Sequence, residues 1–494
     1  MKKRNYIFCL ILGLMSGLGF VPYAYIPLLF VTYSLFFLIF MQANSGLSLF
    51  FTAFAFGFGV GAFSMSWLVN ALLIDAEAFA WAVPLVPIGF GVFFGLFFAF
   101  PALLCRKINA VLPRLLAFAG WVSIFEWIRS WIFTGFPWNL IGSVWVSFLP
   151  VLQLAALTGV YGLSLFSIIW FATPYLIYKK QYTFAFCSIA AFLLVAGFGY
   201  FRLYELKPEY VWGVRLRLVQ PNIEQSLKWT PDTAEDNFMK HIRLSKSKGF
   251  EKITHVLWSE TASPYPFDMA EDARAMAMTA VPQNGTLIAG SLRLADKDNK
   301  LLSNSIFVLN DFGEIISFYD KSHLVPFGEY VPFRGLLPFD KIVPIASDLK
   351  EGSGSKTVRV PNAPPAGMLV CYEIIFPNKV VDSKYRPAWL INVTNDGWYG
   401  LSAGPYQHLA AAQMRAVEEG LPVVRVANTG ISAIIYPWGQ IKSYLPLGTQ
   451  GVLDDQLPKA LNETVYARLG NWIILIFSLL CIVFGIKINK KSNK

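Results

Sequence analysis

Long apolar segments dominate the amino-terminal part of this chain and limit the folds that are open to it. From Tyr6 to Phe201 the sequence is almost continuously apolar, with short loops between the apolar runs. A bilayer span needs about 20 mostly apolar residues in a helix, because backbone polar groups in lipid must find partners within the chain. The pattern predicts eight transmembrane helices, near Tyr6–Phe20, Tyr25–Met41, Leu49–Leu72, Pro84–Leu104, Leu115–Phe133, Leu157–Tyr178, Thr183–Phe201 and Trp472–Ile488.

The remainder of the chain has a different composition. Over the whole sequence 55% of residues are hydrophobic and only 15% are charged, whereas a soluble protein has about 25% charged residues. Lys207–Arg468 instead mixes charged, turn-forming and apolar residues as a globular domain does. We therefore expect a seven-helix transmembrane region over residues 1–205, a globular domain over 206–468, and a last transmembrane helix with a basic tail over 469–494.

Basic residues in the short loops predict the orientation in the membrane, because cytoplasmic loops are enriched in Lys and Arg. With eight spans, all of these residues fall on one side: Lys2, Lys3, Arg4, Arg106, Lys107, Arg114, Lys179, Lys180, Lys487, Lys490, Lys491 and Lys494. Both termini are then cytoplasmic and the globular domain lies outside the cytoplasmic membrane. The basic start and first apolar run resemble a signal peptide, but more membrane segments follow. The net charge of +10 reflects this topology, and we expect no nucleic-acid partner.

The five cysteines separate into two groups. Four of them lie within or at the edge of expected spans, and only Cys371 belongs to the globular domain. A domain in an oxidising compartment normally pairs its cysteines, so a lone thiol there is either buried and inert or kept for chemistry. With four histidines in the chain and no paired cysteines in the domain, a zinc site is not expected.

Short β-type runs alternate with helical stretches in the globular domain, which is typical of an α/β or layered α+β fold. The expected strands are Val214–Gln220, His255–Trp258, Thr286–Gly290, Ser305–Leu309, Gly367–Val370, Trp389–Val393, Val423–Val426 and Ala433–Tyr436. The expected helices are Ala234–Ser247, Asp268–Thr279 and Gln407–Glu419. Glu260, Cys371 and Asn395 come where expected strands end, which is where rigid scaffolds usually place catalytic groups.

Three residues of the domain have the chemistry needed for acyl transfer. A thiol attacks a carbonyl as the thiolate, so Cys371 needs a base and a group that stabilises an oxyanion. Glu260 is the candidate base, and Lys321, at the end of the run that begins at Ile315, is the candidate cation. The backbone amide of Tyr372 is a candidate second oxyanion donor. Spacing in the sequence does not bring these residues together, so their convergence remains a hypothesis at this stage.

Four local strings resemble the apolipoprotein N-acyltransferase family, within the nitrilase or carbon–nitrogen hydrolase superfamily. They are Tyr319–Pro332 (YDKSHLVPFGEYVP), Cys371–Pro377 (CYEIIFP), Val219–Trp229 (VQPNIEQSLKW) and Asn395–Gly400 (NDGWYG). The likeness extends over essentially the whole chain. It implies an α-β-β-α nitrilase-like sandwich inserted between the seventh and eighth helices of a transmembrane bundle in a bacterial inner membrane.

The resemblance also implies a reaction. Cys371 would take a fatty acyl group from a phospholipid as a thioester and pass it to the α-amino group of a lipoprotein's diacylglyceryl cysteine, with no cofactor. Glu260 then matches the base, Lys321 the cation, and Glu329 and Glu373 supporting positions of the family motifs. Independently of the resemblance, aromatic rings favour the headgroup boundary, so Trp229 and Trp398 either contact the lipid substrate or simply fill the core. One departure is Ser259, which stands where many relatives have Pro.

Other interpretations remain open from the residues alone. Cys371 could instead be an inert core cysteine. A histidine such as His408 is more often an ordinary hydrogen-bonding residue than a ligand. Glu126 and Arg129 lie inside an expected span, where charges usually mark function, but they also form an i, i+3 pair that can be structural. The whole chain could be a membrane-tethered amidase that hydrolyses small amides, or a transporter or scaffold with a catalytically inactive domain.

Overall fold

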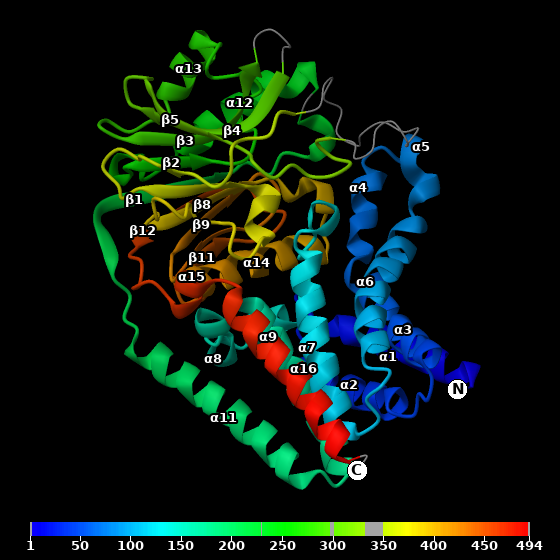
Figure 1. Cartoon of the computed structure of the whole chain (residues 1–494). Helices are drawn as coiled ribbons and strands as arrows, with labels where there is room; N and C mark the ends of the chain where they lie inside the picture. Colours follow the sequence, from blue (N-terminus) through cyan, green and yellow to red (C-terminus); the bar gives the residue numbers. More distant parts are fainter. Residues whose placement is uncertain (1, 229, 297–300, 331–348, 493–494) are drawn as a thin grey trace. The chain divides into compact units, whose positions relative to one another are not determined.

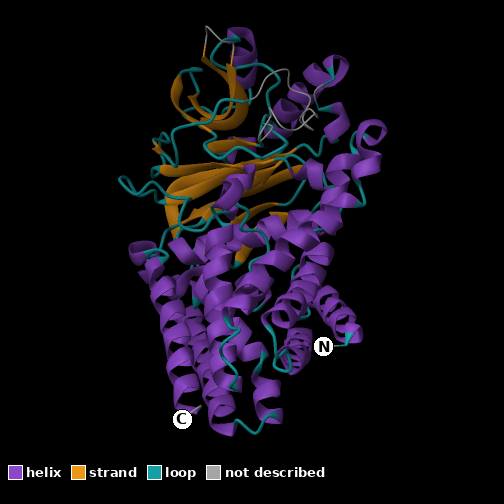
Figure 2. Ribbon diagram, turned by 45° about the vertical axis from the view of Figure 1, so that its right-hand side comes forward, coloured by secondary structure: helices purple, strands orange, loops and turns teal. Residues whose placement is uncertain are grey.

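The chain divides into a helical unit and a strand-containing unit (Figure 2). The structure is a computed structural model that describes residues 2–228, 230–296, 301–330 and 349–492. The helical unit comprises Met1–Leu206, Val417–Glu419 and Glu463–Lys494, and the strand-containing unit comprises Lys207–Ala416 and Gly420–Asn462.

The helical unit contains the apolar segments of the sequence. Its helices are α1 (Lys3–Ser16), α2 (Ile26–Phe40), α3 (Gly46–Ser64), α4 (Val69–Leu73), α5 (Ala76–Phe79), α6 (Leu85–Leu104), α7 (Val111–Arg129), α8 (Leu149–Leu152), α9 (Ala155–Phe171), α10 (Thr173–Tyr178), α11 (Tyr182–Glu205), α15 (Val465–Leu469) and α16 (Trp472–Ser492). Within the described residues, six helical segments are long and apolar enough to cross a membrane: Gly46–Ser64, Leu85–Leu104, Val111–Arg129, Ala155–Tyr178, Tyr182–Glu205 and Trp472–Asn489.

The first two expected spans are shorter helices than the sequence predicted. Helix α1 ends at Ser16, where a 3-10 turn, Gly17–Gly19, follows it. Helix α2 has 15 residues and begins only at Ile26, with a proline in its first turn. The third expected span is also interrupted, because α3 ends at Ser64 and the chain continues as a 3-10 turn and α4. Six segments of spanning length are therefore established among the described residues, and eight are not.

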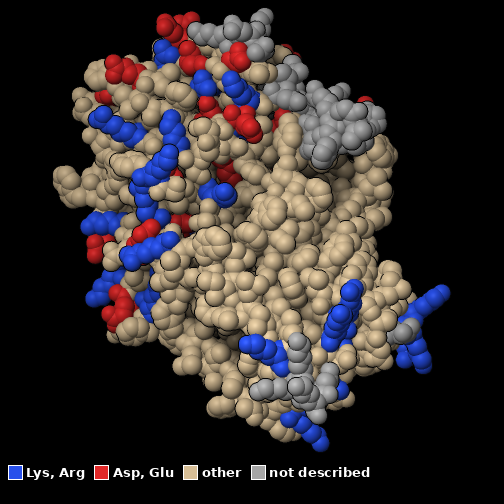
Figure 3. All heavy atoms as spheres, viewed as in Figure 1, with Lys and Arg blue, Asp and Glu red and all other residues tan. Residues whose placement is uncertain are grey.

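Close helix packing in this unit depends on small residues, as is usual where helices associate in a membrane. A Cβ atom on Gly13 of α1 would overlap the carbonyl oxygen of Phe56 on α3. In the face shown in Figure 3, most of the surface of the helical unit carries no charged atoms, while Lys, Arg, Asp and Glu are frequent over the strand-containing unit. This apolar surface agrees with a membrane protein.

Glu126 and Arg129, on the last turn of α7, make contacts that suit a structural pair. A carboxylate oxygen of Glu126 accepts a hydrogen bond from the amide of Ile141 at 2.8 Å and lies 3.9 Å from the Arg129 guanidinium. The guanidinium also lies 4.3 Å from the ring centre of Phe94 on α6. The pair thus ties the end of α7 to the loop that follows it and to α6.

The strand-containing unit is built on two sheets, each with six strands among the described residues. The first has the order β12–β1–β2–β3–β4–β5, and the second has the order β11–β10–β9–β8–β7–β6. The first sheet contains β1 (Tyr210–Gln220), β2 (His255–Trp258), β3 (Thr286–Asp296), β4 (Leu301–Asn310), β5 (Ile315–Asp320) and β12 (Gly451–Pro458). The second contains β6 (Thr357–Val358), β7 (Ala366–Val370), β8 (Trp389–Thr394), β9 (Val423–Ala427), β10 (Ser432–Ile435) and β11 (Ile441–Leu445).

The two sheets pack face to face, with helices on the outer faces, as the layers in Figure 1 show. Leu218 on β1 and Val370 on β7 belong to one fully buried cluster between the sheets. Helices α12 (Pro231–Ser245) and α13 (Glu271–Met278) cover the first sheet, where Phe238 and Trp258 share a second cluster. Helix α14 (Ala403–Glu419) lies against the second sheet (Figure 1). The expected α-β-β-α sandwich is therefore confirmed.

Parallel strands at the centre of each sheet decide where the loops converge. β1, β2 and β3 run parallel in the first sheet, and β7, β8 and β9 run parallel in the second. Glu260 follows the carboxyl end of β2, Cys371 the carboxyl end of β7, and Asn395 the carboxyl end of β8. These ends are where α/β folds place their sites.

Candidate active site

Cys371 sits on a tight turn between β7 and the short 3-10 helix Cys371–Ile375, and only 6% of the residue is exposed. Its φ of 51° lies in the left-handed region, which non-glycine residues adopt only when the surroundings enforce it. Two side chains do so, because the Cys371 carbonyl oxygen contacts Nε2 of His408 at 3.0 Å and accepts from Nδ2 of Asn392 at 3.3 Å. The turn presents the thiol from the end of a buried strand.

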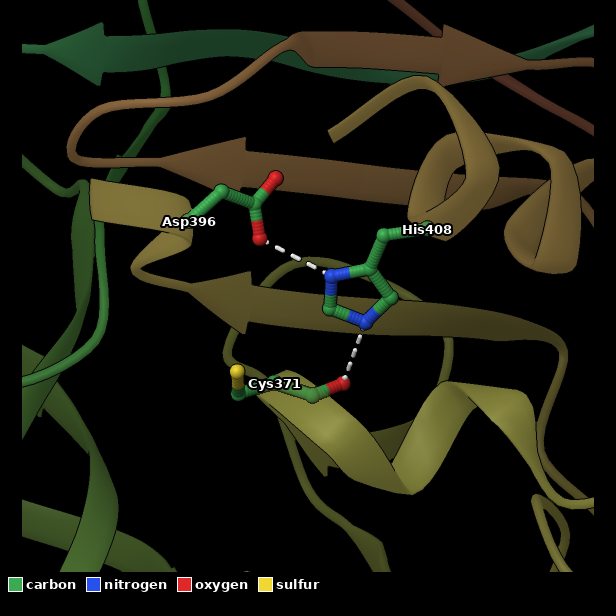
Figure 4. Close-up of side chains that lie close together, drawn as sticks. All are labelled: Cys371, Asp396 and His408. Atoms are coloured by element: carbon green, nitrogen blue, oxygen red, sulfur yellow. Dashed lines mark hydrogen bonds and ion pairs between the residues drawn. The ribbon is translucent and has the colours of Figure 1, made fainter. Parts of the chain in front are cut away.

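A buried charged cluster lies behind this turn (Figure 4). Nδ1 of His408 is 2.8 Å from a carboxylate oxygen of Asp396, whose other oxygen accepts from the Arg425 guanidinium at 2.6 Å. Burial and the Arg425 charge lower the pKa of His408, while Arg425 and His408 hold the pKa of Asp396 low although burial opposes this. The cluster connects β8, β9 and α14 to the Cys371 backbone, so the expectation that His408 is a hydrogen-bonding residue is confirmed.

Cys371, Asp396 and His408 also come close enough to be considered as a metal site, since their ligand atoms lie within 4.8 Å of one another. Both ring nitrogens of His408 already face oxygen atoms, and Arg425 binds Asp396. A metal cation at this point would be repelled by the guanidinium, which lies 3.0 Å from Nδ1 of His408. These contacts are typical of a hydrogen-bonded network that supports the Cys371 turn, and they are less typical of a metal site.

Lys321 and two carboxylates form the second part of the site. Nζ of Lys321, which is 1% exposed, lies 2.8 Å from Glu329 and 3.7 Å from Glu260. Nδ2 of Asn304, on β4, donates to both carboxylates, at 2.7 Å to Glu260 and 3.1 Å to Glu329. Burial alone would lower the pKa of Lys321, but the two carboxylates outweigh it and hold the pKa above its ordinary value. Lys321 therefore remains a cation in a dry pocket.

The environment of the thiol explains why these charges matter. Burial and the charge of Glu260 together raise the pKa of Cys371 to about 12, although Lys321 opposes them. A thiol with this pKa is protonated at neutral pH, so it becomes a nucleophile only when a nearby base takes its proton. Glu260 is the carboxylate whose charge acts on the thiol most strongly.

Glu373 holds the Cys371 turn and the Lys321 loop together. One of its oxygens accepts from the Tyr319 hydroxyl and the Ser322 amide, both at 2.7 Å, and from the His323 amide at 3.0 Å. The other oxygen accepts from the Val370 amide at 2.7 Å. Glu373 is 3% exposed. Its hydrogen bonds link the Cys371 turn, which follows the second sheet, to the Lys321 loop, which follows the first.

Glu260 depends on a glycine of the neighbouring strand. A Cβ atom at Gly290, on β3, would come within 2.5 Å of the Ser259 carbonyl oxygen and the Thr261 amide nitrogen, and within 2.8 Å of the Glu260 Cα. All three are backbone atoms that cannot rotate away. The Ala262 amide in turn donates to the Gly290 carbonyl at 2.8 Å. Ser259 is fully buried in this close contact.

We expect Gly290→Ala to displace the Glu260 loop. Overpacking of this kind costs about 1–3 kcal/mol of stability, and a displacement of about 1 Å in a catalytic group slows a reaction about 10²-fold. Thermal unfolding in detergent and acyl-enzyme formation measure the two effects. Gly451→Ala is the matched control, because its Cβ meets only Leu445, at an ordinary 3.6 Å. Equal activity of the two variants would show that the close approach does not position Glu260.

The structure thus brings together Glu260, Lys321, Glu329 and Cys371, with Glu373 behind them. Tyr372 is 4% exposed, and its ring packs edge-on against Phe376 with 5.1 Å between ring centres. Trp398 lies in the short helix Asp396–Tyr399 and is partly exposed. Trp229 lies outside the described residues. Asn395 shapes a turn, because its side chain accepts from the Gly397 amide.

Sequence reasoning missed three residues of the site. Asn304 donates to both carboxylates, and Lys228 donates to the loop that carries Glu260. The third residue is Tyr399, whose pKa is raised by burial and by the charges of Cys371 and Asp396. Asn304 left a signal, because Ser303-Asn304-Ser305 is a polar run inside a buried strand. Such polar groups need partners when they are buried.

Comparisons with known proteins agree with this architecture. Residues 215–465 match the family model described as carbon-nitrogen hydrolase, and residues 12–173 match the apolipoprotein N-acyltransferase N-terminal domain. The apolipoprotein N-acyltransferase of Rhodopseudomonas palustris is 35% identical over 94% of this chain and 92% of its own length. That of Rickettsia prowazekii is 35% identical over 97% of this chain and 99% of its own length.

One solved structure is also similar in part. An amidase from Nesterenkonia sp. is 16% identical and covers 50% of this chain and 92% of its own, with a TM-score of 0.38. The full-length likeness to the curated relatives is much stronger, since it spans both units of the chain. This chain belongs to the apolipoprotein N-acyltransferase family.

Proposed function

We propose that this protein is an apolipoprotein N-acyltransferase of bacterial lipoprotein maturation, and that Cys371, Glu260 and Lys321 perform the transfer. The observation that carries the proposal is the buried cluster of a thiol, a carboxylate and a permanently charged ammonium at the strand ends of a nitrilase-like sandwich. The same chain carries apolar helices of membrane-spanning length, and its relatives bear the name of this activity.

In the proposed first half-reaction Cys371 attacks an ester carbonyl of a phospholipid. Glu260 accepts the thiol proton and returns it to the leaving alcohol, so that a lysophospholipid departs and a thioester remains. In the second half-reaction the neutral α-amino group of a diacylglyceryl cysteine attacks the thioester carbonyl and loses a proton to Glu260. The C–S bond then breaks, and the Cys371 sulfur takes that proton back as the amide product departs. Each half passes through an oxyanion, which Lys321 stabilises together with the amide of Tyr372. Glu329 keeps Lys321 oriented and charged.

The membrane arrangement belongs to the same proposal. Eight spans, with α1 and α2 as short or tilted ones, place both termini in the cytoplasm and residues 206–468 outside the inner membrane. A site at this position reaches phospholipid of the outer leaflet and lipoproteins anchored there. Trp398 and Trp229 are proposed to contact the acyl chains, because aromatic rings favour the boundary between headgroups and hydrocarbon.

Trapping the acyl-enzyme tests the function directly. The full-length protein in detergent is incubated with phospholipid labelled in its acyl chains, and the peptide that contains Cys371 is analysed by mass spectrometry. We expect an acyl mass on this peptide that neutral hydroxylamine removes, and transfer of the label when a diacylglyceryl peptide is added.

Two other outcomes would replace the proposal. Release of ammonia from small amides, with no labelled thioester, would identify a membrane-tethered amidase, which the carbon–nitrogen hydrolase fold also permits. Normal lipoprotein N-acylation in cells that carry a Cys371→Ala variant would indicate a scaffold or transporter.

A further inference from the structure

A second buried lysine lies next to the candidate catalytic base. Lys228 follows the short 3-10 helix Gln225–Leu227, and only 6% of the residue is exposed. Its ammonium donates to the backbone carbonyl of Glu260 and to the Thr261 hydroxyl, both at 2.8 Å. Lysine is almost never buried to this extent without a specific reason. Both of these acceptors are neutral and both belong to the loop that presents the Glu260 carboxylate.

Side-chain contacts fix the loop that carries Lys228. The amide nitrogen of the Asn395 side chain donates to Gln225 at 2.6 Å, and the Ile223 amide donates to Asn428 at 3.1 Å. Asn428 also donates to Asn395 at 3.0 Å. The ends of β8 and β9 therefore hold this loop over the site from the side of the second sheet. Lys228 follows β1 and Lys321 follows β5, so the two ammonium groups come from different strands of the first sheet.

The two lysines face the same negative groups. Burial lowers the pKa of Lys228 to about 8, while Glu260 and Cys371 oppose that decrease. The interaction between Lys228 and Cys371 is reciprocal. A Cys371 thiolate stabilises the charged form of Lys228, and the charged Lys228 stabilises the thiolate by the same amount. His241 on α12 also faces Lys228, but burial lowers its pKa to about 4, so it adds no charge at neutral pH.

We propose that Lys228 is a positioning residue that holds the Glu260 loop and supplies the second positive charge of the active site. With Lys228 and Lys321 charged, the pocket contains two ammonium groups against the carboxylates of Glu260 and Glu329. These four charges then balance one another. Without the Lys228 charge, the same groups carry a net negative charge that resists formation of a thiolate.

The proton and electron balance of acylation shows what this charge does. The S–H bond of Cys371 breaks, its proton moves to Glu260, and the sulfur electron pair forms the bond to the acyl carbon. The carbonyl π electrons move to oxygen, and on collapse they expel the alcohol oxygen, which takes the proton back from Glu260. Negative charge moves from carboxylate to sulfur to oxyanion, and the total does not change. A fixed cation beside this path stabilises the thiolate and then the oxyanion as each of them forms.

Charge and shape at Lys228 can be separated by substitution. Lys228→Met keeps the length of the side chain without its charge, Lys228→Arg keeps the charge, and Thr261→Val removes one hydrogen-bond acceptor with the charge in place. The first readout is the rate at which iodoacetamide alkylates Cys371 at pH 7, where Lys228 is mostly charged, followed by mass spectrometry of the Cys371 peptide. This rate follows the thiolate fraction and needs no acyl donor. The second readout is the rate of acyl-enzyme formation from phospholipid.

We expect Lys228→Met to slow the alkylation of Cys371 by about 10-fold or more, because loss of one nearby opposite charge raises a pKa by about 1 unit or more. Acyl-enzyme formation should fall at least as far. Lys228→Arg should recover most of both rates. Thr261→Val should keep the alkylation rate, because the charge stays in place, but slow acyl-enzyme formation, because the Glu260 loop loses one of its two contacts with Lys228. The inference rests on the proposed role of Cys371, but alkylation is measured without a lipid, so an error in the proposed function would leave this readout unaffected.

Two results would overturn the proposal. One is a folded Lys228→Met protein, judged by thermal unfolding in detergent, whose alkylation rate equals that of the wild type. The other is failure of Lys228→Met to fold together with failure of Lys228→Gln, a second neutral variant that retains an N–H donor. That result would assign the lysine to folding alone.

Discussion

Replacement of Cys371 by alanine is expected to abolish acyl-enzyme formation, with a loss on the order of 10⁶-fold in turnover, as for nucleophiles of other acyl-transfer enzymes. The Cys371 turn presents the thiol where the charge of Lys321 acts on it. Cys371→Ser is expected to be almost as inactive. A serine hydroxyl is far less acidic than a thiol, and a carboxylate such as Glu260 is too weak a base to activate it.

The control for this prediction is Cys187→Ser, since Cys187 is exposed and lies in the helical unit. Its acylation rate should match that of the wild type. Both proteins should unfold at similar temperatures in detergent, because removing the Cys371 thiol leaves the carbonyl contacts of the turn in place. Retention of labelled acyl groups on Cys371→Ala, at any residue of the strand-containing unit, would show that another side chain is the nucleophile.

The central strands of the sandwich could be predicted from the sequence because they are buried on both faces. Residues 256–258 and 389–391 are unbroken apolar runs, and the structure places them in β2 and β8. The edge strands β6, β11 and β12 were not predicted. β11 (Ile441–Leu445) is only half-buried, and β12 (Gly451–Pro458) contains two adjacent aspartates. An edge strand keeps one side in water, so its hydrophobic pattern is weak.

The position of the site could be predicted only in part, for a related reason. A polar residue at the tip of an apolar strand stands out in a sequence, and this identified Glu260 and Cys371. Convergence of the two depends on the packing of one sheet on the other, which no spacing encodes. Asn304 and Lys228 were missed because each acts through Glu260, which is distant in the sequence. The separation is 44 residues for Asn304 and 32 residues for Lys228.

Loss of the Lys321 charge should produce the second largest effect. In Lys321→Met, the carboxylates of Glu260 and Glu329 share a buried pocket and the side chain of Asn304 without their common cation. Two like charges in such a site raise the pKa of at least one carboxylate. The pair of carboxylates then retains a proton more readily and is a weaker acceptor for the proton of the thiol. Both half-reactions also lose a cation beside the oxyanion, which is worth about 10²- to 10³-fold for a single donor.

We therefore expect Lys321→Met to slow thioester formation and thioester aminolysis alike, each by about 10²- to 10⁴-fold. The remaining activity should increase with pH, because a base with a raised pKa becomes deprotonated only at higher pH. Single-turnover measurements with labelled phospholipid, and separately with preformed acyl-enzyme and a diacylglyceryl peptide, test the two halves. A defect in only one of them would contradict the assignment of Lys321 to both oxyanions.

Stability and chemistry can be separated in the same experiment. Breaking a buried ion pair by removing one partner costs about 3–5 kcal/mol, whereas replacing both partners is much less harmful. The double variant Lys321→Met/Glu329→Gln should therefore unfold at a higher temperature than Lys321→Met, yet remain as inactive. Lys384→Met, at an exposed position of the same unit, should change neither property. Recovery of acyl transfer along with stability would mean that Lys321 serves the fold and that the oxyanion finds its positive charge elsewhere.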